Sequence, residues 1–273
     1  MRDIDTALPA FVDLHSHLVP AVDDGSASIE ESRDSFAALY GEGVRVLVTT
    51  PHLLLPRLPD DDALERELAS QRHAFDLMAE NLAGQSGLPL LALGQEIWAP
   101  DAVAMRRVSE RTDVGLDGSP TLLVEFGFQL EGTHTDVIET AVAAGRRIVI
   151  AHPERYTYVQ GERPLDLMRR WRDMGALLQV NAGSFSGHYR SSSPGSRALA
   201  WEMVDEGLVD LIATDHHGIR RIGVSPREAY DVLRARGEGA LAERAMAEIP
   251  AALLRDGALA EREEALRTPS GDA

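Results

Sequence analysis

The sequence predicts an α/β protein in which about seven βα units surround a mainly parallel sheet closed into a barrel. Short apolar, β-branched runs alternate along the chain with helix-periodic stretches, which is the pattern of βα units. The runs IVIA and DLIAT are almost wholly apolar, as expected of strands buried on both faces. The 273 residues suit one such domain, because α/β barrels commonly run to roughly 200–250 residues undivided. We therefore expect a single domain over 1–273 with its core over about 11–235.

Each expected strand is a short apolar run bounded by turn residues or helix signals. The strands are expected over 11–15, 45–49, 90–93, 122–125, 147–151, 177–181 and 211–214. Ser28, followed by acidic residues, is a helix N-cap signal. Helices are expected over 28–41, 60–83, 133–144, 163–174, 195–205 and 226–234, with a charged, alanine-rich helical extension over about 238–267. The Gly- and Ser-rich stretch 183–196 is expected to be a long functional loop.

Composition excludes several classes of function. The net charge of −17 argues against a nucleic-acid partner, because few basic residues are available to displace counterions. The chain has no cysteine and no lysine, so all 27 basic residues are arginine. Thiolate metal sites, cysteine-based phosphatases, P-loop lysines and carbamylated lysines are therefore excluded. No apolar run approaches the roughly 18 residues of a membrane span, and the first ten residues lack a signal-peptide core. The sequence thus predicts a cytoplasmic protein that is not inserted in a membrane.

Ionisable residues collect where the expected strands end. Six of the nine histidines do so, together with four acids: His15, His17, His52, His152, His216, His217, Asp24, Glu96, Glu125 and Asp215. The carboxyl ends of parallel barrel strands meet at one rim, so these side chains are expected to converge. His15 and His17 are two residues apart on an extended backbone, so both imidazoles can reach one ion.

Each of these signals has an ordinary reading when it is taken alone. The two leading histidines could be polar rim residues, the sequence VDDG containing Asp24 could be a turn, and His52 could be a solvated loop residue. Glu96 and Glu125 lie in apolar surroundings and could form buried ion pairs with arginine. The agreement of five separate strand ends favours a metal centre instead.

The chemistry of the candidate ligands indicates which ions would bind. Nitrogen and oxygen donors suit Mn²⁺, Fe or Zn²⁺. There are too many ligands for one ion, so two or three divalent ions are expected, with Glu96 as a bridging carboxylate. Centres of this kind promote phosphoester hydrolysis. Arg155, three residues after His152, is a candidate phosphate contact, and Arg220 and Arg221 are further candidates.

The remaining histidines and the tryptophans have no role in this hypothesis. His73 and His134 are expected at the surface, and His188 is left undecided. The three tryptophans at 98, 171 and 201 are expected to pack in the core or in a lid rather than to stack on a substrate.

The motifs FVDLHSHLVPAVDDGSASIEES, VLVTTPH, LGQEI, LLVEF, VIAHPERY, LLQVNAGS and LIATDHH occur in this order. Together they resemble the PHP-domain protein-tyrosine phosphatases of the capsule-biosynthesis type (CpsB/CapC-like), over about residues 11–230. The resemblance implies a distorted (β/α)₇ TIM-like barrel with a trinuclear centre, often of manganese or iron. It also implies hydrolysis of phosphotyrosine on a protein, typically a bacterial tyrosine kinase that controls exopolysaccharide or capsule synthesis.

The resemblance also assigns residues. The implied metal ligands are His15, His17, Asp24, His52, Glu96, Glu125, His152, Asp215 and His217. The implied catalytic set is Arg155, Arg221, His52 and Glu125, where Arg155 matches a phosphate-binding arginine of the family. An ungapped match places the second phosphate-binding arginine at Ile222, so Arg221 is preferred and Arg220 stays open.

One departure from the family pattern bears on the substrate. Many relatives carry a histidine or a basic residue after TPH, whereas this chain has the apolar segment LLLPRLP. An apolar cleft entrance would suit an aromatic leaving group. The alternatives are a PHP-family phosphatase for a small metabolite such as histidinol phosphate, an amidohydrolase-type enzyme, and a non-catalytic scaffold that binds a kinase.

Overall fold

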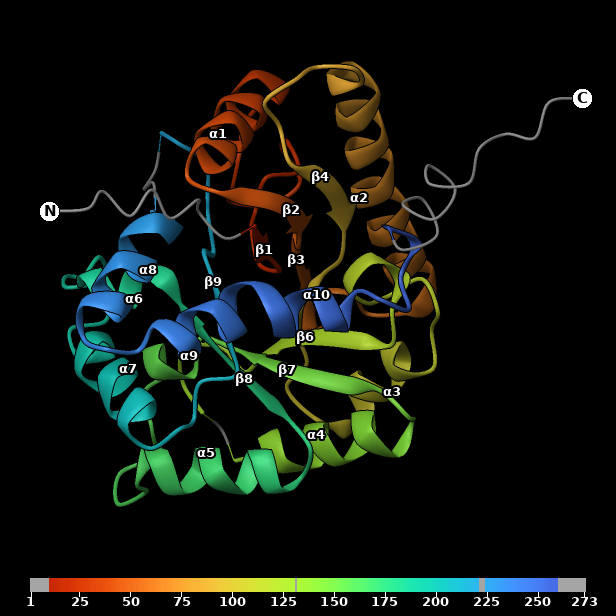
Figure 1. Cartoon of the computed structure of the whole chain (residues 1–273). Coiled ribbons are helices and arrows are strands. Elements are labelled where there is room, and N and C mark those ends of the chain that lie inside the picture. Colours follow the sequence, from red (N-terminus) through yellow and green to blue (C-terminus); the bar gives the residue numbers. More distant parts are fainter. Residues whose placement is uncertain (1–9, 131, 221–223, 260–273) are drawn as a thin grey trace, which may run out of the picture.

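Parallel strands form two sheets in the computed structural model, which describes residues 10–130, 132–220 and 224–259 (Figure 1). The first sheet has the order β1 (Phe11–Asp13), β2 (Val44–Thr49) and β4 (Leu90–Leu93). The second has the order β3 (His52–Leu54), β5 (Glu96–Trp98), β6 (Thr121–Glu125), β7 (Arg147–Ala151), β8 (Leu177–Asn181) and β9 (Leu211–Ala213). All of the pairs in both sheets are parallel.

Two of the expected strands continue past a bend. β3 follows β2 after Pro51, and β5 follows β4 after Gly94. Proline has no N–H to donate to the ladder, so regular pairing is interrupted there. Backbone hydrogen bonds cross both bends, because Gly94 N donates to Thr49 O (2.8 Å) and Glu96 N donates to Pro51 O (3.2 Å). Each bent pair therefore corresponds to one strand, which gives the seven strands that the sequence predicts.

The ends of β1 and β9 are also joined. Ser16 forms a parallel bridge with His216. Asp215 N donates to His15 O, and His17 N donates to His216 O, both at 2.8 Å. Pairing therefore runs from β1 around to β9 and back to β1. The expectation of an α/β fold with a distorted barrel of parallel strands is confirmed.

Helices surround the strands in Figure 1, with α9 and α10 crossing in front of them. The helices are α1 (Ile29–Gly41), α2 (Asp61–Leu82), α3 (Ala102–Ser109), α4 (His134–Ala143), α5 (Pro164–Asp173), α6 (Ala182–Ser186), α7 (Ser196–Asp205), α8 (Pro226–Ala235), α9 (Gly239–Glu243) and α10 (Ile249–Leu253), with a π-helical turn over Arg244–Glu248. Ser28 caps α1 as expected, because its side chain accepts a hydrogen bond from Glu31 N.

Three expectations need correction. The sequence did not predict α3, which begins after the N-cap Asp101. The stretch 183–196 is not a plain loop, since α6 takes up its first residues and α7 begins at its end. His134 is buried rather than at the surface, because it packs against Phe126 and Trp171, with ring centroids 5.8 and 5.3 Å away. Part of the expected C-terminal extension, 260–267, lies outside the described residues.

Apolar side chains fill the barrel and close one end of it. The closing cluster is Val12, Leu14, Val48, Ala92, Leu116, Leu123, Val149, Ala151, Leu211, Leu253, Leu254 and Leu259. The backbone oxygen of Leu253, at the end of α10, also accepts hydrogen bonds from Thr121 Oγ1 (3.4 Å) and Arg147 Nη2 (3.3 Å). Thr121 and Arg147 begin β6 and β7. The C-terminal helices therefore cover the amino ends of the strands and leave the carboxyl ends for the site.

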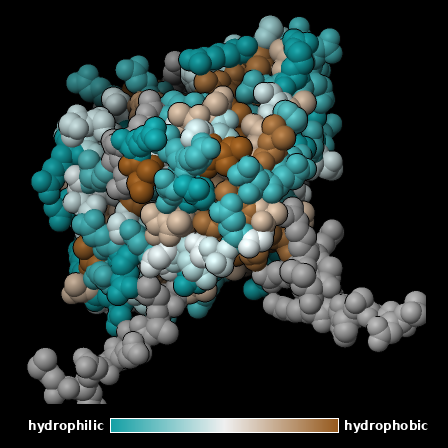
Figure 2. Space-filling view, turned by 90° about the horizontal axis from the view of Figure 1, so that it is seen from above, coloured by the Kyte–Doolittle hydropathy of each residue, from teal (hydrophilic) through white to brown (hydrophobic). Residues whose placement is uncertain are grey.

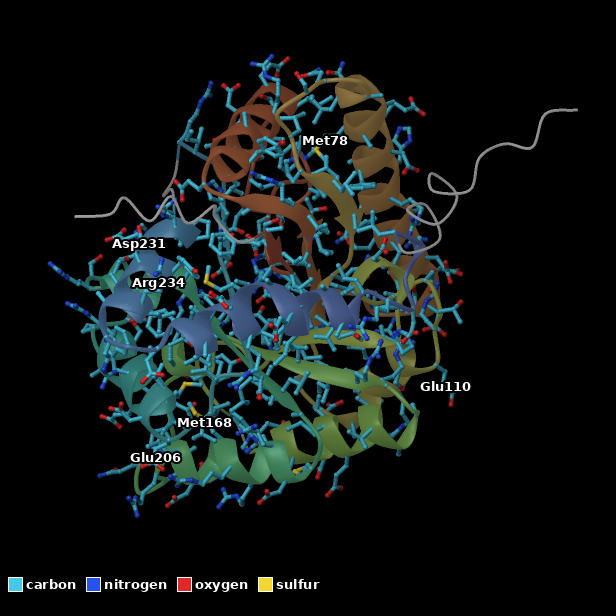
Figure 3. The ribbon with its side chains drawn as sticks, in the orientation of Figure 1. Met78, Glu110, Met168, Glu206, Asp231 and Arg234 are labelled. Atoms are coloured by element: carbon cyan, nitrogen blue, oxygen red, sulfur yellow. The ribbon has the colours of Figure 1, made fainter. Side chains whose placement is uncertain are left out.

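The outer surface is polar with scattered apolar residues. Glu110 and Glu206 lie at the periphery, whereas the side chain of Met78 lies on the buried side of α2 (Figure 3). Figure 2 shows small apolar patches among hydrophilic residues on the face seen from above. Within the described residues, no helix is long and apolar enough to cross a membrane.

Candidate metal centre

All nine predicted metal ligands converge at the carboxyl ends of the strands. They form four overlapping groups, and within each group the potential ligand atoms lie within 4.8 Å of one another. The groups are His17, Asp24, His52 and His217; His15, His152 and Asp215; His15, His17 and Glu96; and His52, Glu96 and Glu125. The residues come from chain positions 15 to 217, so the parallel topology alone brings them together.

Glu96 lies at the centre of the cluster. Its side chain is fully buried, and the pairing of β3 with β5 places it beside His52. Its Oε1 atom lies 2.9 Å from His152 Nε2 and 3.2 Å from His15 Nε2. Its Oε2 atom lies 2.9 Å from His52 Nδ1 and 3.4 Å from His17 Nε2. The two oxygens therefore face different histidines, as a bridging carboxylate would.

The hydrogen-bond partners of His15 and His17 leave both side chains able to bind a cation. His15 Nδ1 lies 2.9 Å from Gln179 Oε1, and His17 Nδ1 lies 2.8 Å from Asp23 Oδ2. These acceptors favour a proton on each Nδ1, which leaves the lone pair of each Nε2 free for a metal. The two Nε2 atoms lie only 3.2 Å apart and face the same space. Two lone pairs so close together repel unless a cation or a proton lies between them.

The electrostatics of the cluster favour positive charge. Burial lowers the pKa of His52, but its hydrogen bonds with Asp24 and Glu96 raise it to about 10. Burial, and then the negative charge of Glu96, raise the pKa of Glu125 to about 8. Burial also opposes the charge of Glu96, but the charge and hydrogen bond of His15 hold its pKa well below the ordinary value. Bound divalent cations would satisfy the same carboxylates.

Two of the candidate ligands have unusual backbone conformations. His152 has φ 35° and Asp215 has φ 52°, both in the left-handed region that residues other than glycine rarely adopt. Each follows a strand directly or nearly so, after β7 and β9. Such strain costs on the order of 1–3 kcal/mol per residue and is typical of functional positions. Both side chains contact the cluster, since His152 Nε2 lies 2.9 Å from Glu96 Oε1 and Asp215 Oδ1 lies 3.4 Å from His15 Nε2.

Asp215 connects the cluster to Arg155. Its Oδ1 atom lies 3.3 Å from His17 Nε2. Its Oδ2 atom accepts hydrogen bonds from Asn181 Nδ2 (2.7 Å) and Arg155 Nη1 (2.6 Å). The structure thus places Arg155 directly beside the candidate metal centre.

The second expected arginine is not placed. Arg221 lies outside the described residues, so its role stays a prediction. Arg220 is exposed, and its backbone N donates to Glu31 Oε1 (3.4 Å).

Sequence reasoning missed the residues that hold the ligands. Asp23 precedes the predicted ligand Asp24, and its carboxylate orients His17. Gln179 and Asn181 alternate in the otherwise apolar run LLQVN, so both side chains lie on one face of β8. Two polar residues on one face of a buried strand are the feature of the sequence from which these supporting residues could have been predicted.

A cavity of about 1050 Å³ opens over the cluster. Its floor carries ligands such as Glu96 and His152, and its wall includes Leu54, Trp98 and Phe128. The cavity can therefore accept a molecule that has one charged end and one apolar end.

Comparison with known proteins identifies the family of this chain. Residues 11–255 match the model of the family described as "Capsular polysaccharide synthesis, CpsB/CapC". The chain belongs to the CpsB/CapC family. Tyrosine-protein phosphatase YwqE of Bacillus subtilis is 28% identical over 224 residues, which cover 81% of this chain and 83% of that protein. The putative tyrosine-protein phosphatase CapC of Staphylococcus aureus is 30% identical over 210 residues, which cover 76% and 77%.

The fold agrees with that of solved relatives. Crystal structures of YwqE from Bacillus subtilis and CpsB from Streptococcus pneumoniae are described as those of unique metal-dependent tyrosine phosphatases. The match has a TM-score of 0.74 at 24% identity and covers 90% of this chain and 95% of that one.

Proposed function

We propose that this protein is a metal-dependent phosphatase that hydrolyses phosphotyrosine in proteins. The observation that carries the proposal is the convergence of nine candidate nitrogen and oxygen ligands beside Arg155, seven of which line one cavity. The names of the relatives, which are tyrosine-protein phosphatases, support the same activity.

The proposed cofactor is a set of two or three divalent ions. Mn²⁺ is preferred, with Fe and Zn²⁺ as alternatives that suit the same donors. Nine ligands exceed the needs of one ion, and the two oxygens of Glu96 face different histidines. When bound, such ions supply an activated water and polarise phosphoryl oxygens.

The protein's own residues would hold and orient the phosphate. Arg155 can offer several N–H donors to phosphate oxygens, and its contact with Asp215 fixes the guanidinium at the floor of the cavity. Arg221 is proposed as the second phosphate contact. His52 and Glu125 are proposed to act in catalysis as well as in metal binding, since both line the cavity beside Glu96.

The proposed substrate is a phosphotyrosine-bearing protein, in particular a bacterial tyrosine kinase of capsule or exopolysaccharide synthesis. The description of the family supports this process. A cytoplasmic location is part of the same proposal.

The test is hydrolysis by purified protein that has been stripped of metal and reloaded with Mn²⁺. We expect Mn²⁺ to restore activity on p-nitrophenyl phosphate and on a phosphotyrosyl peptide, with much weaker activity on histidinol phosphate. Faster turnover of histidinol phosphate would favour a metabolite phosphatase. Bound metal without activity on any of the three esters would refute the proposal and favour a scaffold.

A further inference from the structure

Apolar side chains follow the metal ligands outward on two neighbouring strands. On β3, Leu54 lies two residues beyond His52, and on β5, Trp98 lies two residues beyond Glu96. Residues two apart on a strand point to the same face. The two strands pair His52 with Glu96 and Leu54 with Trp98, so an apolar pair lies directly above a ligand pair. Both apolar side chains line the cavity.

Phe128 is a third apolar residue on this wall. Its side chain is 54% exposed, so the ring is accessible from the cavity that it lines. Its backbone is held, because Thr157 N donates to Phe128 O (2.7 Å) and the next residue, Gln129, forms a parallel bridge with Thr157. The ring lies nearly parallel to that of the candidate ligand His152, with centroids 6.3 Å apart and an interplanar angle of 15°.

The anion contact lies beside the same ring. The Arg155 guanidinium carbon is 5.2 Å from the centre of the Phe128 ring and 4.2 Å from that of Tyr189. The same guanidinium binds Asp215 at the metal centre. A phosphate held by Arg155 would therefore have its ester group next to Phe128.

We propose that Phe128, Trp98 and Leu54 form a subsite for the aromatic ring of an aryl phosphate. Phe128 is the residue of this subsite that sets the preference for aryl over alkyl esters. This inference rests on the proposed function and adds to it the residues that recognise the leaving group. More than half of the Phe128 side chain is exposed, so an aromatic group that enters the cavity can pack against its ring.

The experiment measures binding directly by calorimetry. Mn²⁺-loaded protein is titrated with phenylphosphonate and with methylphosphonate, which share the anion and differ in the ring. We expect the wild-type protein to prefer phenylphosphonate. Phe128→Ala should reduce this preference by about threefold to tenfold, the usual contribution of one aromatic pair. Phe128→Tyr should retain the preference, since the ring is kept.

A matched control removes an exposed apolar side chain elsewhere. Leu77 on α2 is 49% exposed and does not line the cavity, so Leu77→Ala should leave the preference unchanged. An unchanged ratio in Phe128→Ala, or equal weakening of both phosphonates, would overturn the subsite while aryl phosphate hydrolysis by the wild type still supported the proposed function. A wild-type protein that binds neither phosphonate and hydrolyses no phosphate ester would overturn both.

Discussion

Asp23 offers a sharp test of how the metal centre is supported. Its Oδ2 atom accepts from His17 Nδ1 (2.8 Å) and from His52 N (3.2 Å), and its Oδ1 atom accepts from Gly25 N (2.9 Å). Asp23→Asn keeps the size of the side chain but replaces one oxygen by an amino group. At least one of the three donors must then face another donor. Supporting contacts of this kind contribute about tenfold to hundredfold to metal affinity, or about 1.4–2.8 kcal/mol.

The assay is the Mn²⁺ retained after dialysis against graded chelator, measured by mass spectrometry. We expect Asp23→Asn to lose Mn²⁺ at about tenfold to hundredfold lower chelator strength than the wild type. Asp34→Asn is the matched control, because Asp34 pairs only with Arg33 in an exposed contact among the interactions described for it. If Asp23→Asn held Mn²⁺ as tightly as the control while His17→Ala did not, the reasoning about Asp23 would be wrong.

Three further predictions concern activity and stability. His152→Ala should abolish phosphatase turnover and lower metal content while the circular dichroism spectrum is unchanged, and normal activity with normal metal content would contradict its role as a ligand. Burial lowers the pKa of His134, so the unfolded state binds its proton more readily and this residue costs stability as the pH falls below about 6.5. Between pH 7.5 and 5.5, the free energy of unfolding in urea should therefore fall less for His134→Phe than for the wild type, and equal losses would contradict the assignment. Leu253→Ala should destabilise the fold by about 2–5 kcal/mol in the same assay, whereas Leu77→Ala should cost about 0.5 kcal/mol or less.

The fold was largely predictable because its signals are local. A buried parallel strand needs a continuous apolar run, and each of the seven expected runs forms a strand. The bends at Pro51 and Gly94 were not predicted: the expected strands end at residues 49 and 93, whereas pairing resumes at His52 and Glu96. The helix α3 was missed because its eight residues are too few to show a clear period.

The candidate site was predictable to a similar degree, and for a related reason. Ligands fall at strand ends, and strand ends can be read from the sequence. The supporting residues depend on neighbours that are distant in sequence: His15 and Gln179 are 164 residues apart. His134 was misjudged for the same reason, because its burial depends on Trp171 of another helix. Spacing along one chain carries no information about such pairs.

The C-terminal helices also constrain the order in which the chain can fold. Leu253, Leu254 and Leu259 belong to the cluster that closes the amino ends of the strands, and that cluster begins with Val12. The amino ends of the strands therefore stay uncovered until the chain has been synthesised through Leu259. Contacts of such long range form slowly, so the nascent chain exposes its apolar strands for most of synthesis. A dependence on chaperones during production would follow from this late closure, even though the metal centre lies at the opposite end of the barrel.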